Sequence, residues 1–181
     1  MKNKLMKMLV VSMLVVVMAS SAMAATIDLL PTWATATWWD NNGCSASSYE
    51  YQCVNAFDAK NLSTASIDRE EVFSFQNLPV NGTYTINSVT LKYYAKEYDS
   101  ANDKFKSLLV TGLGQYASGY FLLSSSWVVK DTVWLLHPDT GLAWTESDVN
   151  NLLAGMTTAG LTSGDAGAKI NKVWAVIDYT N

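Results

Sequence analysis

The sequence predicts an all-β protein: a two-sheet antiparallel β-sandwich, jelly-roll-like, with one short helix near the C-terminus. Three observations predict it. Apolar and polar residues alternate with the period of a strand in several segments, turn residues separate these segments at short intervals, and one segment carries a helix entry signal. The composition agrees, because 49% of the 181 residues are apolar and 15% are charged, which excludes an intrinsically disordered chain. A single barrel is the alternative architecture.

The first 24 residues have the layout of a secretory signal peptide. Three lysines precede an apolar run from Met8 to Met18, and Ala22-Met23-Ala24 is an A-x-A cleavage pattern. We expect cleavage before Ala25, which leaves one domain at residues 25–181. The alternative is an uncleaved membrane anchor, but the apolar run is shorter than the ~20 residues that cross a bilayer. The sequence therefore predicts a secreted protein, extracellular or periplasmic, with no membrane span after cleavage.

Cleavage also changes the charge of the protein. Three of the 12 basic residues and none of the 16 acidic residues lie in the signal segment, so the net charge becomes −7 instead of −4. A chain this acidic is not attracted as a whole to nucleic acid or to an anionic membrane. We therefore expect no nucleic-acid partner.

The first strands follow the predicted cleavage site. Residues 25–32 are β-prone, and we expect a strand of the chain's own domain; the alternative is an arm that fills the sheet edge of a neighbouring copy in a fibre. Residues 33–39 alternate, with Trp33, Thr35, Thr37 and Trp39 on one face. Glu71 to Gln76 is a short strand in which Val72 faces away from Phe73 and Phe75.

The clearest strand runs from Thr83 to Tyr98, after the turn signal Asn81-Gly82. Its two faces differ in character. The face that we expect to be buried carries Val89, Leu91, Tyr93 and Ala95, and the wet face carries Thr90, Lys92, Tyr94 and Lys96. This alternation is typical of a sheet with one face on the core and one in solvent.

Four further strands and one helix complete the prediction. The strands are Phe105 to Thr111, Tyr116 to Leu123, Trp127 to Leu136 and Ile170 to Tyr179. Thr145 and Asp148 form a capping box that starts a helix. Val149, Leu152, Leu153 and Met156 follow at helical spacing, and Gly155 is a natural stop signal.

The two cysteines are Cys44 and Cys53. In an oxidising compartment, two cysteines this close in sequence predict one disulfide. It would close a small loop and stabilise the fold by about 2–3 kcal/mol. A two-cysteine metal site is the alternative, but the single histidine, His137, is remote in sequence.

A P-x-T-G-x-x-W-T-x-x-D motif runs from Pro138 to Asp148. Trp134 precedes it, and the closing strand Lys172 to Tyr179 follows. Together with upstream apolar segments and the polar Asp58, these residues resemble uncharacterised secreted bacterial and phage-related β-sandwich modules. The resemblance covers about Asp58 to Tyr179. It implies a non-catalytic surface or structural part, and it assigns no functional residue.

The strongest candidate binding residues are aromatic and amide side chains around the disulfide loop: Trp38, Trp39, Asp40, Asn41, Tyr49 and Tyr51. Flat rings stack on the apolar C–H faces of sugars, and amides or carboxylates take the hydroxyls. Trp38 and Trp39 are adjacent, so a strand would point them to opposite faces, one into the core and one to solvent. The alternative is that all seven tryptophans are core.

A second candidate site is the polar loop with Asp99, Asn102 and Asp103, whose oxygens are ligands that Ca²⁺ prefers. If the chain binds a cofactor, we expect extracellular Ca²⁺ there; solvated turn residues are the alternative. No catalytic residue is predicted. His137 sits in a surface turn without a nucleophile motif beside it, and no pair of glutamates stands out as a glycosidase pair.

Two functions remain. The first is a structural or adhesive surface subunit that acts through protein–protein contacts, with itself as partner in a homo-oligomer or filament, or with a cell-surface protein or glycan. The alternative is a carbohydrate-binding module that uses the surface near Trp38 to Tyr51. A glycoside hydrolase comes third, because no catalytic motif supports it.

Overall fold

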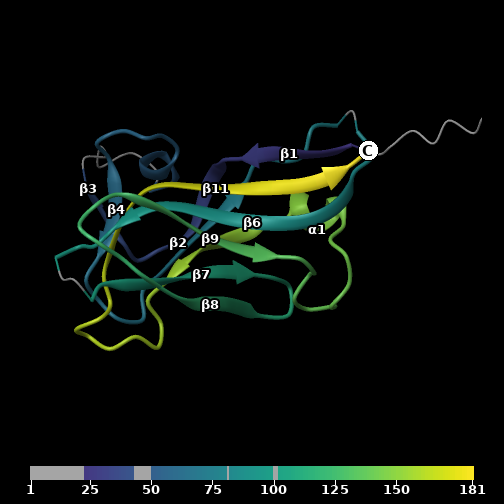
Figure 1. Ribbon diagram of the computed structural model, residues 1–181. Coiled ribbons are helices and arrows are strands. Elements are labelled where there is room, and N and C mark those ends of the chain that lie inside the picture. The colour runs from purple at the N-terminus through teal and green to yellow at the C-terminus, as the bar shows by residue number, and fades with distance from the viewer. Residues whose placement is uncertain (1–22, 43–49, 81, 100–101) are drawn as a thin grey trace, which may run out of the picture.

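The fold consists of two antiparallel sheets packed face to face, as the sequence predicts (Figure 1). The computed structural model describes residues 23–42, 50–80, 82–99 and 102–181. The predicted signal peptide up to residue 22, the turn residue Asn81 and Cys44 therefore lie outside the described residues. Within the described part of the chain, no helix is long and apolar enough to cross a membrane.

The six-stranded sheet has the order β3-β4-β11-β6-β9. The sixth strand, β1, pairs with the C-terminal part of β11, whereas β4 pairs with its N-terminal part. Its strands are β1 (Ala24–Leu29), β3 (Asp40–Asn42), β4 (Asn61–Thr64), β6 (Thr85–Lys96), β9 (Val128–Trp134) and β11 (Ala168–Thr180). The long strands β6 and β11 lie side by side through most of their length (Figure 1). They form the middle of this layer.

The five-stranded sheet has the order β2-β5-β10-β7-β8. Its strands are β2 (Pro31–Thr37), β5 (Glu70–Phe75), β7 (Lys104–Val110), β8 (Gln115–Leu122) and β10 (Leu153–Thr157). A 3₁₀ helix, η1 (Glu50–Val54), and one α-helix, α1 (Glu146–Asn150), lie in the connections. The predicted class, a β-sandwich with one short helix near the C-terminus, is confirmed.

The core lies between the sheets and is built by the predicted alternation. Val89, Leu91, Tyr93 and Ala95 of β6 are all fully buried, and they belong to one cluster with the aromatic and aliphatic side chains of the opposite sheet. Each fully buried large apolar side chain stabilises the fold by about 1.5–3 kcal/mol relative to an exposed one.

One polar group crosses this core. The Tyr93 hydroxyl donates to the Gly155 carbonyl oxygen of β10 and shares a second hydrogen bond of 2.7 Å with Ser107 Oγ of β7. Burial raises the pKa of Tyr93, so the hydroxyl stays a donor. The two sheets are thereby joined by hydrogen bonds as well as by apolar packing.

The N-terminal arm is a strand of its own domain. β1 pairs antiparallel with β11 from Ala24↔Thr180 to Leu29↔Ala175, which confirms the strand predicted for this segment. Leu29 is buried in the core. Cleavage before Ala25 would shorten β1 by a single residue.

The predicted helix is right at its start and wrong at its end. Thr145 caps α1, and both bonds of the capping box with Asp148 are present. The helix stops at Asn150, however, and Leu153–Thr157 is the central strand of its sheet, paired with β5 and β7. Side chains on both faces of this strand are buried or partly buried, so buried and exposed residues do not alternate along it. Gly155 is needed there because a Cβ would lie 1.8 Å from the Glu71 carbonyl oxygen.

The prediction that Trp33 and Trp39 share one strand face is also wrong. β2 ends at Thr37, and its pairing with β5 shifts register twice. The Trp33 side chain is 49% exposed, whereas Trp39 is 5% exposed and belongs to the core. The shifts turn the strand, so a simple alternation does not carry across it.

Candidate functional site

A polar pocket of about 260 Å³ opens where the chain passes from β2 of one sheet to β3 of the other. Its lining residues come from three short segments of the chain. They are Trp38, Trp39, Asp40, Thr64, Ser66 and Arg69. We call it the Trp38 pocket.

The two tryptophans have opposite roles in this pocket. Trp38 is 61% exposed, and Trp39 is 5% exposed and part of the core. The sequence predicts this division, although the pair lies between β2 and β3 and not inside a strand. The Arg69 guanidinium carbon lies 5.6 Å from the centroid of the Trp38 ring, a cation–π contact that helps to fix the exposed indole.

A buried carboxyl group supports the two tryptophans from below. Glu71 Oε2 accepts hydrogen bonds from the backbone N–H groups of Trp38 (3.1 Å) and Trp39 (3.3 Å). Burial raises the pKa of Glu71 to about 8, although those two hydrogen bonds oppose the rise; the nearby Glu50 carboxylate adds to it. The Glu71 side chain is 0% exposed. It positions the Trp38–Trp39 backbone and does not reach a ligand.

The other predicted binding residues are divided. Asp40 is exposed and lines the Trp38 pocket. Tyr51 packs against the core, and its hydroxyl accepts a hydrogen bond from Gln52 Nε2. Asn41 is the middle residue of β3, but its side chain lies outside the described residues, as does Tyr49.

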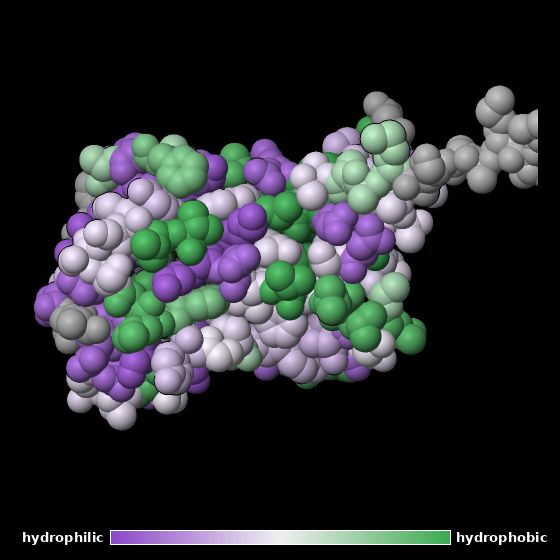
Figure 2. All heavy atoms as spheres, viewed as in Figure 1, coloured by the Kyte–Doolittle hydropathy of each residue, from purple (hydrophilic) through white to green (hydrophobic). Residues whose placement is uncertain are grey.

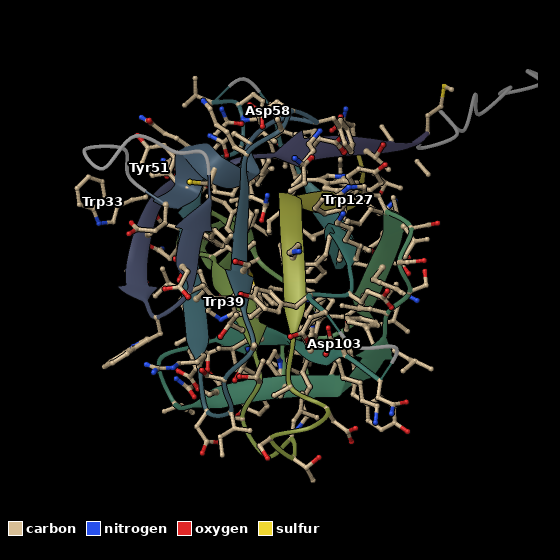
Figure 3. All side chains as sticks on the ribbon, turned by 90° about the vertical axis from the view of Figure 1, so that its left-hand side faces the viewer. Trp33, Trp39, Tyr51, Asp58, Asp103 and Trp127 are labelled. Carbon is tan, nitrogen blue, oxygen red and sulfur yellow. The ribbon has the colours of Figure 1, made fainter. Side chains whose placement is uncertain are left out.

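Figure 3 shows Trp33 and Tyr51 on one side of the molecule, with Trp39 closer to its middle. Cys53 is buried in η1 and is not a free thiol. Its predicted partner Cys44 lies outside the described residues, so the pairing of the two cysteines stays a prediction.

Four residues of this region were not singled out as site residues from the sequence: Thr64, Ser66, Arg69 and Glu71. For Glu71 a signal existed. It lies two positions before Phe73, and side chains two positions apart in a strand share a face. A glutamate on the core face of a strand is rarely buried without partners. Its position therefore indicated that its carboxyl group takes part in hydrogen bonds.

The predicted calcium loop is held by one of its own side chains. Asp103 is buried, and its Oδ2 accepts hydrogen bonds from the backbone N–H groups of Tyr98 and Asp99. Asp99 and Asn102 are exposed. Among the described residues, no group of three His, Cys, Asp or Glu side chains could hold a metal ion. A calcium site with Asn102 as a ligand stays a prediction.

His137 lies in a turn but is not a surface residue, contrary to the prediction. Its side chain is 12% exposed, with Nε2 4.0 Å from Asp148 Oδ1, and its ring packs edge-on against Trp144. A small pocket of about 140 Å³ lies beside it. Because Asp148 already serves the helix cap, this cluster has a structural explanation.

The sequence matches no known protein family and no curated protein. In shape the chain is similar to the C-terminal CBM6 of LamC, a marine laminarinase from Zobellia galactanivorans. The two sequences are 12% identical, the alignment covers 84% of this chain and 98% of the CBM6 chain, and the TM-score is 0.43. A family 29 carbohydrate-binding module from Piromyces equi is 14% identical, covers 84% and 90%, and has a TM-score of 0.40. At these TM-scores, the function proposed below rests on the chain's own residues.

Proposed function

We propose that this protein is a non-catalytic carbohydrate-binding module that holds a glycan at the Trp38 pocket. One observation supports the proposal above all others. The exposed indole of Trp38 stands beside a pocket whose lining offers hydroxyls, a carboxylate and a guanidinium. A flat apolar ring next to donors and acceptors is complementary to a sugar, which has apolar C–H faces and polar edges.

The pocket groups divide the work of recognition. Trp38 stacks on a sugar face, Arg69 and the hydroxyls of Thr64 and Ser66 bond its oxygens, and Asp40 accepts from its hydroxyls. At about 260 Å³ the pocket is smaller than sites for drug-sized ligands, which begin near 300 Å³. We therefore expect it to hold one sugar residue while the rest of the glycan extends outside.

The support under Trp38 favours affinity. Because Glu71 and the buried Trp39 fix the backbone on which Trp38 stands, little ordering remains when a sugar binds, and preorganisation of this kind increases affinity. Because the Glu71 carboxyl group is buried beneath the pocket and does not line it, the pocket favours binding over hydrolysis. Two carboxyl groups must flank the bond that a glycosidase cleaves, and within the described lining Asp40 supplies the one carboxylate.

The structural or adhesive subunit predicted first has less support. One route to such an assembly, an N-terminal arm that fills the sheet edge of a neighbouring copy, is not what the structure has, because β1 pairs with β11 of the chain's own sheet. Secretion fits a glycan ligand outside the cell and stays part of the proposal. The mass of the purified protein, expressed with its N-terminal segment in place, tests cleavage before Ala25.

A glycan array followed by titration of the retained ligand tests the proposal. Trp38→Ala should weaken binding at least tenfold, which corresponds to about 1.4 kcal/mol. The matched control is Trp33→Ala, since Trp33 is also half-exposed but is not part of the pocket lining. No retained glycan, or equal affinity of the wild type and Trp38→Ala, would overturn the proposal. Trp39→Ala is unsuitable here because it empties a core position.

A further inference from the structure

The outer face of the six-stranded sheet carries lysines and aromatic rings in alternation. On β6 and β11 the cross-strand neighbours on this face are Lys96↔Lys169, Tyr94↔Lys172 and Lys92↔Trp174. On the part of the surface drawn in Figure 2, hydrophobic and hydrophilic side chains are likewise interleaved over the strands seen in Figure 1. We call the four lysines, with Phe57, Tyr94, Trp127 and Trp174, the aromatic–lysine face.

The rings of this face form one continuous row. Phe57 lies edge-on to Trp174 (6.1 Å between centroids) and to Tyr94 (5.1 Å). Tyr94 in turn stacks on Trp127 at 5.3 Å with an interplanar angle of 23°. The row therefore crosses from β11 over β6 to the start of β9. Phe57 is 60% exposed, so the row is open to a ligand at its middle.

Two of the four lysines are held beside these rings. Lys172 Nζ lies 4.3 Å from the Phe57 centroid and 5.0 Å from that of Trp174. Lys96 Nζ lies 5.0 Å from the centroid of Trp127. Cation–π contacts of this kind fix where the ammonium groups stand. Across the residues that the structure describes, none of the four lysines is within 4.0 Å of a carboxylate oxygen.

The charge of this face is opposite to that of the whole protein. The chain has 16 acidic and 12 basic residues. Nine of the basic residues follow residue 24, and four of those nine are on this face. Asp131, the β9 partner of Lys92, places one carboxylate on this face. A positive face on an acidic protein is complementary to a negatively charged ligand.

We propose that the aromatic–lysine face is a second binding surface, which takes an anionic polysaccharide. The exposed ring of Phe57 and the partly exposed rings of Tyr94 and Trp127 receive the apolar faces of successive sugars, while the buried Trp174 supports Phe57. The ammonium groups meet the carboxylate or sulfate substituents of the sugars as point charges. A row that crosses three strands suits an extended polymer better than a small molecule. In Figure 3, Trp127 lies on the other side of the view from Trp33 and Tyr51. The residues that line the Trp38 pocket include none of this face, so the two surfaces use different side chains.

Affinity electrophoresis of the purified full chain tests the proposal, at about 0.15 M salt. The gels contain polygalacturonate as a carboxylate polymer, dextran sulfate as a sulfate polymer, or dextran as the neutral control. At least one polyanion should retard the protein. The neutral dextran should not bind the aromatic–lysine face. The polymer that retards it more strongly identifies the anionic group.

Three variants locate the interaction. Phe57→Ala and Lys172→Gln should each weaken polyanion binding about fivefold, which corresponds to roughly 1 kcal/mol. Lys106→Gln makes the same charge change on the other sheet, where Lys106 Nζ donates to the Ala159 carbonyl oxygen, and should leave binding within about twofold. Circular dichroism confirms that each variant is folded.

Other outcomes overturn the proposal. No retardation by either polyanion would do so, as would equal losses in Lys172→Gln and Lys106→Gln, which would indicate unspecific attraction. Equal binding of single-stranded oligothymidylate would assign the face to nucleic acid, since bases also stack on rings beside cations. Trp38→Ala should not change polyanion binding, so failure here is distinguishable from failure of the glycan pocket.

Discussion

The buried carboxyl group of Glu71 should make the protein less stable as the pH rises from acidic to neutral. The pKa of Glu71 is raised from 4.5 to about 8 in the folded protein, chiefly by burial. Between these two values the folded state keeps a proton that the unfolded state has lost. The contribution of Glu71 to stability is therefore fully present below about pH 4.5 and is lost as the pH approaches 8.

The magnitude is large. At 1.36 kcal/mol per pKa unit, the difference between 4.5 and about 8 corresponds to roughly 5 kcal/mol. A domain is typically stable by only about 5–15 kcal/mol. Glu71→Gln removes the titration but keeps a side-chain oxygen that can accept from the N–H groups of Trp38 and Trp39. The variant should match the wild type near pH 4.5 and exceed it by several kcal/mol at pH 8.

Urea unfolding followed by tryptophan fluorescence, at pH values from 4.5 to 8, measures the difference. The matched control is Glu70→Gln, one residue away, where the carboxylate accepts a bond from Gln115 Nε2 at the surface. Its stability curve should follow that of the wild type. Parallel curves for Glu71→Gln and the wild type across this range would refute the assignment of Glu71 as a buried, protonated positioning residue.

Three further changes test the core and the turn. Gly155→Ala should cost about 3 kcal/mol or more, seen as lost soluble yield or an early urea midpoint, because its Cβ would meet the Glu71 carbonyl oxygen. Tyr93→Phe should cost about 1–3 kcal/mol in the same assay, because the Gly155 carbonyl loses its hydroxyl donor. Asp139→Asn should lower the melting temperature at neutral pH, because the Tyr116 hydroxyl donates to this carboxylate and lowers its pKa. That deficit, followed by circular dichroism, should shrink as the pH falls below 3.8, since a lowered pKa stabilises the fold only where the group is ionised.

The parts of the fold that could be predicted are those with one buried face. In β6 the buried side chains of Val89 and Leu91 alternate with the partly exposed, polar Thr90 and Lys92, so the sequence itself records the sheet's two sides. The segment Leu153–Thr157 has neighbours on both edges and cover on both faces. Apolar and polar residues then do not alternate, and Leu152, Leu153 and Met156 match helical spacing by chance. A short apolar run does not distinguish a buried strand from a helix.

The candidate site was predictable in its residue types and not in its assembly. The pair Trp38-Trp39 next to Asp40 marks a place where rings and polar groups meet. The expected division of the two rings between solvent and core is present, although it was argued from a strand and the pair lies between β2 and β3. Arg69 and Glu71 reach the same place only because β5 pairs with β2 in a register that shifts twice. Such shifts depend on contacts between segments more than thirty residues apart, and no local pattern contains them.

The contribution of Phe57 to stability is too small to explain its place on the aromatic–lysine face. A fully buried phenylalanine stabilises a fold by about 1.5–3 kcal/mol, and at 60% exposure Phe57 retains less than half of that effect. Its ring nevertheless sits between Tyr94 and Trp174, beneath the Lys172 ammonium group. If this arrangement serves the fold alone, Phe57→Ala should lower stability by about 1 kcal/mol and leave polyanion binding unchanged. If the arrangement serves recognition, polyanion binding should fall even where circular dichroism shows that the Phe57→Ala variant is folded. The loss of stability then cannot account for the loss of binding.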